Sequence, residues 1–151
     1  MAYRALKLEK EGAVAIVTLN RPDAGNSFDF RLMEEVDAAM REVSKDKSIR
    51  AVILTGSGKY FSTGINLSMF TDAKGMVEKD GGVEDKITDD ADQTYGKGTP
   101  VAAVIRMRSM NKPVIAAING PTVGAALSLV LGCDIRIASD KARFSMIFVK
   151  R

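Results

Sequence analysis

Histidine is absent from this sequence of 151 residues, and cysteine occurs once, at Cys133. Without histidine, neither a histidine-based catalytic triad nor a histidine metal site can form. A single cysteine excludes an internal disulfide framework and is typical of a reducing compartment. Because no histidine can activate it, we interpret Cys133 as a buried, inert thiol rather than a nucleophile. Acid–base chemistry must therefore come from Asp, Glu, Lys, Tyr or water.

Long apolar runs are also missing. No run reaches the roughly 18 residues of a membrane span, and the N-terminus "MAYRALKLEKEG" lacks the apolar segment of a signal peptide. With 46% hydrophobic residues, the chain is rich enough in apolar side chains to form a packed core. The sequence therefore predicts one globular domain over residues 1–151, no membrane partner and a cytoplasmic location.

Charge is unevenly distributed along a chain whose net charge is +3. Eight acids and three lysines lie between Asp72 and Asp92, in a stretch with few large apolar residues and no sustained period. Such a composition predicts a mobile loop over residues 72–98. The remainder is basic, but no stacking motif accompanies the charge, so a solvated basic surface is favoured over nucleic acid as a partner.

Hydrophobic periodicity predicts an α/β chain. Alternation predicts two strands forming a hairpin, three-and-four spacing predicts an amphipathic helix, and branched apolar runs predict buried strands. A proline at position 113 ends the helix before it. The expected strands are 3–10, 13–20, 51–55, 113–118, 134–139 and 142–147, and the expected helices are 30–44, 100–110 and 124–132.

Two glycine-containing junctions, "GSGKYFSTGIN" and "NGPTVGAAL", each follow a buried strand. The first is not a Walker loop, because Ile53 and Tyr60 occupy positions where that pattern needs Gly and Ser or Thr. Each junction leads toward a helix, where free backbone N–H groups attract negative charge. Two such groups could converge on one oxygen and stabilise an oxyanion. Alternatively, the small residues 124–126 only allow the helix to pack tightly against a sheet.

Several stretches in order resemble the crotonase superfamily, the enoyl-CoA hydratase/isomerase group: "NRPDAGNSF", "AVILTGSGKYFSTGINL" and "NKPVIAAINGPTVGAALSLVLGCDIRIASDKARF". The resemblance covers residues 4–148 apart from the acidic segment. It implies a spiral of ββα turns that binds an acyl-CoA thioester and stabilises its enolate, with coenzyme A as part of the substrate, no separate cofactor and no metal. For the acidic segment, which the resemblance does not cover, we predict a mobile lid at residues 72–98 that borders the acyl pocket.

The same resemblance assigns the oxyanion-hole N–H groups to Ile65, after Gly64, and to Ala125, after Gly124. It implies substrate contacts from both glycines and from three further positions, which are Asn66, Ser128 and Phe148. The family's hydratases carry water-activating glutamates where this sequence has Ser128 and Phe148, and an aspartate where it has Asn66.

These departures leave three functions open. Neither Ser128 nor Phe148 can exchange a proton near neutral pH. The first possibility is an acyl-CoA enzyme of the isomerase or hydratase type with another acid. The second is a non-catalytic acyl-CoA-binding or assembly protein, and the third, suggested only by the basic remainder, is an RNA-binding member. For Asn66, a loop-anchoring amide is favoured over a substrate contact.

The sequence stops where members of this family continue with further strands and helices. We therefore expect a chain that lacks the C-terminal part of the fold, with "ARFSMIFVKR" as an exposed hydrophobic edge. The resemblance implies a homotrimer or a dimer of trimers for the full-length protein, because the family's C-terminal helices build the trimer.

Overall fold

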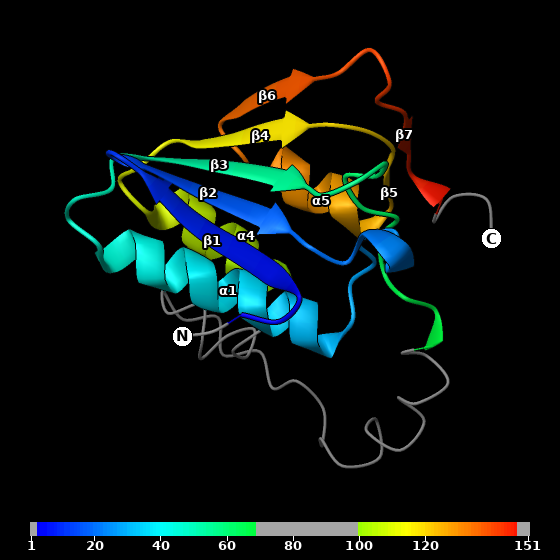
Figure 1. The fold of residues 1–151 in the computed structure, drawn as a ribbon, viewed down its shortest axis with the longest axis horizontal. Coiled ribbons are helices and arrows are strands. Elements are labelled where there is room, and N and C mark those ends of the chain that lie inside the picture. Colours follow the sequence, from blue (N-terminus) through cyan, green and yellow to red (C-terminus); the bar gives the residue numbers. More distant parts are fainter. Residues whose placement is uncertain (1–2, 69–99, 148–151) are drawn as a thin grey trace, which may run out of the picture.

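A five-stranded sheet forms the centre of the computed structural model, which describes residues 3–68 and 100–147 (Figure 1). Its strand order is β1-β2-β3-β4-β6, and only the β1–β2 hairpin is antiparallel. The strands are β1 (Leu6–Glu11), β2 (Val14–Leu19), β3 (Ala51–Gly56), β4 (Val114–Ile118) and β6 (Ile135–Ala138). The parallel strands run together, so their carboxyl ends meet at one edge of the sheet.

Three helices lie against one face of this sheet (Figure 1). They are α1 (Phe30–Lys45), α4 (Pro100–Ser109) and α5 (Ala125–Leu131). Helix α1 begins at Asp29, whose side chain accepts the Leu32 N–H, as expected of an N-cap. The mixed α/β architecture matches the predicted fold class, and the expected elements lie within a few residues of those observed.

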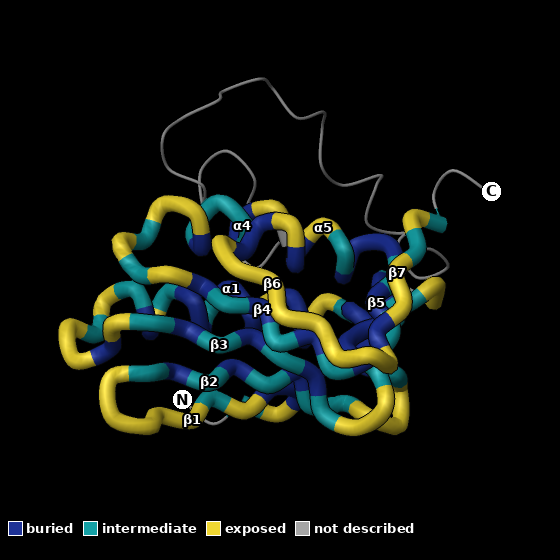
Figure 2. The backbone as a smooth tube through the Cα atoms, turned by 90° about the horizontal axis from the view of Figure 1, so that it is seen from above, coloured by how far each residue is buried: buried dark blue, intermediate teal, exposed yellow. Residues whose placement is uncertain are grey.

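The core lies between the sheet and the helices. Along β2, β3 and β4 every second residue is buried, and α1 contributes buried residues at helical spacing (Figure 2). The outward-facing residues of these strands are only half-buried, and three of them, Ile16, Ile53 and Ile115, lie in register across neighbouring strands. The alternating pattern seen in the sequence thus corresponds to one covered and one uncovered sheet face.

A second, two-stranded parallel sheet pairs β5 (Thr122–Val123) with β7 (Phe144–Ser145). Neither its first strand nor the short helix η1 (Pro22–Ala24) was expected from the sequence. The predicted strand over residues 142–147 is reduced to the two residues of β7. A two-residue strand leaves too little periodicity to be recognised in a sequence.

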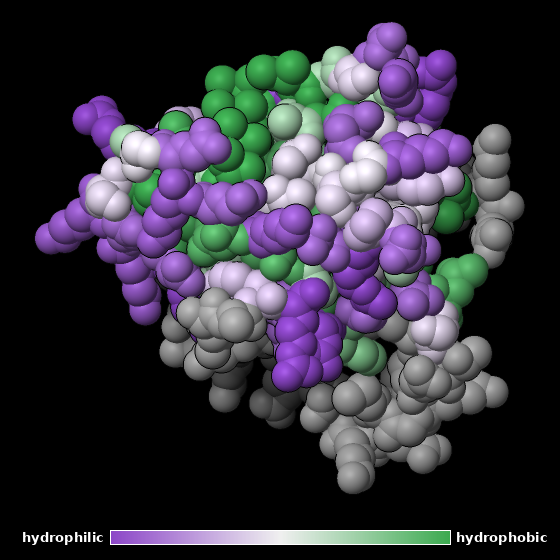
Figure 3. Space-filling view, in the orientation of Figure 1, coloured by the Kyte–Doolittle hydropathy of each residue, from purple (hydrophilic) through white to green (hydrophobic). Residues whose placement is uncertain are grey.

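Hydrophobic side chains are exposed along the last part of the described chain. All four residues of β6 are exposed, and Ile135 and Ile137 contribute to the hydrophobic area over this edge strand in Figure 3. Phe144 and Met146 are also exposed, as predicted for this stretch. An edge strand of this kind offers unpaired backbone groups beside apolar side chains.

The predicted mobile loop at 72–98 lies outside the described residues. Within residues 3–68 and 100–147, no helix is long and apolar enough to cross a membrane. The same part of the chain contains no cluster of three or more His, Cys, Asp or Glu side chains that could hold a metal ion.

Candidate functional site

The two glycine-containing junctions lie side by side at the carboxyl ends of β3 and β4. We call residues 61–66 the first arm and residues 121–125 the second arm. Ser62 and Thr122 form a parallel bridge, and the Val123 N–H donates to the Ser62 carbonyl at 3.0 Å. The fold thus brings together two segments that are distant in the sequence and runs them in the same direction.

The arms pack tightly against each other at Gly64. A Cβ atom on Gly64 would lie 2.5 Å from the Val123 carbonyl oxygen and 3.5 Å from the Ala125 nitrogen. Gly64 also has a φ of +86°, a conformation that side chains disfavour. Gly124 has a φ of 54°, with the same preference for glycine. Gly64 is therefore required by backbone shape and by the contact between the arms, and Gly124 by backbone shape.

Two backbone N–H groups in these arms, those of Ile65 and Ala125, have no hydrogen-bond acceptor among the described residues. Ile65 follows Gly64 as Ala125 follows Gly124, so the two groups occupy equivalent places in the parallel register set by Ser62 and Thr122. Buried or half-buried N–H groups without acceptors are rare in proteins. A pair at equivalent positions is therefore a candidate for binding one ligand oxygen.

The direction of each N–H group follows from its own peptide plane. The Gly64 carbonyl accepts the Phe28 N–H at 2.8 Å, and the Gly124 carbonyl accepts the Leu127 N–H at 2.9 Å within the first turn of α5. In a planar trans peptide the N–H points opposite to the carbonyl. The Ile65 N–H therefore points away from Phe28, and the Ala125 N–H points away from the helix.

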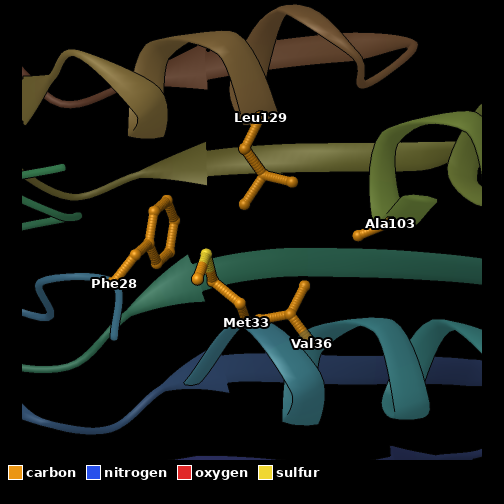
Figure 4. A pocket seen from close by; sticks show the side chains of 5 residues that line it. All are labelled: Phe28, Met33, Val36, Ala103 and Leu129. Carbon is orange, nitrogen blue, oxygen red and sulfur yellow. The ribbon is translucent and has the colours of Figure 1, made fainter. Parts of the chain in front are cut away.

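Phe28 itself is fixed in the core. Its ring is 2% exposed and borders a small apolar cavity of about 10 Å³, towards which the five labelled side chains point (Figure 4). The other lining residues come from three helices: Met33, Val36, Ala103 and Leu129. Close packing on every side leaves Phe28 little freedom, so its backbone is a firm partner for the first arm.

A larger recess, of about 380 Å³, opens beside Ile65. Polar and apolar side chains line it, and none of these described residues is a carboxylate: Ala24, Ser27, Thr63, Ile65, Asn66, Leu67 and Ile147. A site of mixed lining with a few polar groups is typical of small-molecule binding.

The other predicted site residues are placed as follows. Asn66 borders the recess, and its side-chain oxygen accepts the Ser68 N–H at 3.1 Å, a loop-anchoring bond of the kind favoured from the sequence. Ser128 is exposed on α5, one turn after Ala125. Phe148 lies outside the described residues, although β7 before it contacts the second arm through a bond of 2.9 Å from the Gly124 N–H to the Ser145 carbonyl.

Cys133 is buried, with 2% of its surface exposed. Burial raises the pKa of its thiol to about 11, and the neighbouring Arg136 only partly opposes this shift. The thiol therefore stays protonated at neutral pH, in line with the inert role that we predicted.

Sequence reasoning assigned no role to Asn26 and Ser62, although both stand in the quoted motifs. Each is 0% exposed, and the Ser62 hydroxyl donates to the Asn26 carbonyl at 2.7 Å. The Lys112 ammonium group donates to the Val43 and Asp46 carbonyls at the end of α1. The available signal was an uncharged polar residue close to a phenylalanine, with Asn26 two positions before Phe28 and Ser62 directly after Phe61.

Comparison with known proteins gives consistent matches. The profile of the Enoyl-CoA hydratase/isomerase family matches residues 9–151. The short-chain-enoyl-CoA hydratase of Clostridium acetobutylicum is 38% identical over 138 residues, which is 91% of this chain and 47% of that protein. A probable enoyl-CoA hydratase of Mycobacterium tuberculosis, echA8, is 33% identical over 99% of this chain and 52% of its own length.

Solved structures agree with these matches. An enoyl-CoA hydratase/carnithine racemase from Magnetospirillum magneticum superposes with a TM-score of 0.77 at 32% identity, covering 99% of this chain and 52% of that one. A monofunctional enoyl-CoA isomerase from M. smegmatis gives a TM-score of 0.69 at 32% identity, covering 93% of this chain and 53% of that one. This chain therefore belongs to the enoyl-CoA hydratase/isomerase (crotonase) family and spans about half the length of the relatives that it matches.

Proposed function

We propose that this chain binds an acyl-CoA thioester and holds its carbonyl oxygen between the N–H groups of Ile65 and Ala125. The observation that carries the proposal is the pair of N–H groups without acceptors at equivalent places in two parallel arms. Membership of the enoyl-CoA hydratase/isomerase family supports an acyl-CoA as the ligand.

Two donors on one oxygen would stabilise the negative charge that an enolate places there. The same interaction makes the α-carbon more acidic, which serves both isomerisation and hydration of an enoyl-CoA. The proton itself would be moved by an acid or base that the recess does not supply, since no carboxylate is among its described lining residues. The reaction is therefore assigned only to the isomerase or hydratase type.

A second candidate is a non-catalytic acyl-CoA-binding or assembly protein. It is favoured by Ser128, which stands on α5 where the family resemblance implies a hydratase glutamate. Binding requires only the recess and the two N–H groups, whereas rapid hydration requires positioned acids. The two candidates share the ligand and differ in turnover.

Calorimetric titration with butyryl-CoA and with S-butyl-CoA tests the ligand assignment, because the second compound is a thioether without the carbonyl. Two hydrogen bonds of about 0.5–1.5 kcal/mol each predict roughly tenfold tighter binding of the thioester. In the infrared spectrum, the ¹³C-labelled thioester carbonyl band should move to lower frequency on binding. Equal affinities together with an unshifted band would refute the proposed hole.

Steady-state hydration of crotonyl-CoA by the same protein separates the two candidates. A positioned acid–base group contributes about 10²–10⁴-fold, so we expect slow hydration alongside measurable binding. Ser128→Glu alone should not restore full activity, because position 148 would still hold phenylalanine. Rapid hydration by the unmodified protein would contradict our interpretation of Ser128 and Phe148.

The finer expectations from the sequence, namely the trimeric assembly, the cytoplasmic location and the lid at 72–98, remain predictions for the full-length protein. Sedimentation of that protein with and without butyryl-CoA would measure the assembly directly.

A further inference from the structure

We infer that Asn26 is a positioning residue that sets the direction of the Ile65 N–H group. This inference rests on the proposed function, because it assigns a role in the same oxyanion hole. Asn26 is 0% exposed and is the one non-glycine residue with positive φ, 51°, in the described part of the chain. A buried asparagine held in this conformation needs compensating contacts.

Both polar atoms of the Asn26 side chain and its main-chain carbonyl have hydrogen-bond partners. The Asn26 side-chain oxygen accepts the Arg21 N–H at 2.8 Å, and its amide nitrogen donates to the Ser57 and Tyr60 carbonyls, both at 2.9 Å. Its main-chain carbonyl accepts the Ser62 hydroxyl at 2.7 Å. One side chain thus joins the loop that precedes α1 to the turn that precedes the first arm.

Ser62 links Asn26 to the first arm through its hydroxyl group. Its hydroxyl donates to Asn26 and also accepts the Gly64 N–H at 3.2 Å. Its main chain is bonded to the second arm through Pro121 and Val123. Asn26 therefore acts on Gly64 through one intervening hydroxyl group.

A second connection reaches the next peptide, which joins Gly64 to Ile65. Phe28, two residues after Asn26, donates its N–H to the Gly64 carbonyl and accepts the Asn66 N–H, both at 2.8 Å. The positive φ of Asn26 directs the chain into Phe28, and the peptide plane of Gly64 and Ile65 follows from the bond to Phe28. Asn26 is thereby linked to the peptide before Gly64 through Ser62, and to the peptide that carries the Ile65 donor through Phe28.

Asn119 provides a matched control. Its side chain also makes three hydrogen bonds to the same turn, with the Gly56 N–H and the Gly58 and Tyr60 carbonyls. Among the described residues, its side chain makes no hydrogen bond to Ser62 or Phe28. Asn119→Ala therefore loosens the turn to a similar degree without releasing the first arm.

The test compares the preference for butyryl-CoA over S-butyl-CoA in the full chain and in two variants, Asn26→Gly and Asn119→Ala. Glycine keeps the positive φ and removes only the amide. We expect Asn26→Gly to lose most of the roughly tenfold preference, with the S-butyl-CoA affinity unchanged and a smaller infrared shift of the thioester carbonyl. Asn119→Ala should keep both the preference and the shift.

Retention of the full preference in Asn26→Gly would overturn the inference and leave the hole intact. No preference in the unmodified chain would instead overturn the proposed function, and the inference with it. If Asn26→Gly does not fold, Ser62→Ala removes the hydroxyl that links the Asn26 carbonyl to the Gly64 N–H, and should lower the preference by about threefold. A Ser62→Ala protein with unchanged preference and unchanged carbonyl shift would likewise refute the role of Asn26.

Discussion

The two arms of the candidate site are fixed by different kinds of contact. The first arm, residues 61–66, depends on the buried side chains of Asn26 and Ser62 in addition to its main-chain bonds. The second arm, residues 121–125, is held by main-chain bonds: the Thr122 N–H donates to the Arg143 carbonyl and the Gly124 N–H to the Ser145 carbonyl. Both arms nevertheless present one N–H group in the same register.

This difference predicts which single substitutions can weaken the contacts that fix each arm. Replacing a side chain cannot remove a main-chain hydrogen bond, so the second arm should tolerate changes that keep its backbone conformation. The first arm should respond to the loss of one hydroxyl or amide, because a buried partner is then left unsatisfied. Substitutions in the two arms therefore measure this difference.

The largest effect is expected where the arms touch. Gly64→Ala would place a Cβ atom 2.5 Å from the Val123 carbonyl oxygen at a φ of +86°. We expect a loss of about 2–4 kcal/mol in the free energy of unfolding, measured by urea denaturation, because clash and backbone strain act together. Butyryl-CoA binding should also be lost.

Gly12→Ala is the control for that substitution. Gly12 has a φ of +57°, but nothing lies within 4 Å of the Cβ position. It should therefore cost only about 1 kcal/mol, from backbone strain alone. Equal losses in the two variants would mean that the contact between the arms does not require glycine.

Alkaline pH tests the packing around the helix that continues from the second arm, because Cys133 lies two residues after the end of α5. The pKa of its thiol is raised from 9.0 to about 11 by burial, so the unfolded thiol ionises first. Its contribution to stability is present below about pH 9 and is lost as the pH rises through about 11, by about 3 kcal/mol in total. Between these pH values, the free energy of unfolding should fall more steeply with pH in the unmodified protein than in Cys133→Ala. Equal slopes would contradict the raised pKa of the thiol.

A smaller effect should separate the arms directly. Ser62→Ala removes a hydroxyl that bonds both Asn26 and Gly64, and should cost about 1–2 kcal/mol. Ser145→Ala keeps the carbonyl that bonds Gly124, and should change stability by less than about 0.5 kcal/mol. Thermal unfolding of both variants gives the comparison, and equal costs would remove the distinction between the arms.

The smallest effect is expected for Asn66→Asp, at the position where the family resemblance implies aspartate. A carboxylate oxygen can still accept the Ser68 N–H, so stability should change by less than about 0.5 kcal/mol. Urea denaturation of this variant beside Asn66→Ala tests the anchoring role. A large loss with aspartate would show that the amide nitrogen is needed.

Periodicity predicted the long elements well. The amphipathic pattern around Leu32 and Val36 and the branched run of β3 correspond to observed structure, because burial on one face imposes their spacing. Resemblance pointed to Gly64 and Gly124, which the fold brings together. It could not indicate Asn26, whose importance depends on contacts with a turn about thirty positions away in the sequence. It also could not indicate β5, which forms only because β7 pairs with it.

The bridge between Ser62 and Thr122 also has a kinetic consequence. These residues are sixty positions apart, so their pairing closes a long stretch of chain and follows the parallel pairing of β3 with β4. Long-range parallel contacts form slowly, because their loop-closure entropy is lost before they contribute stability. During refolding, helix α1 should therefore form before the two arms meet, and the proposed thioester binding should appear only at the end of folding.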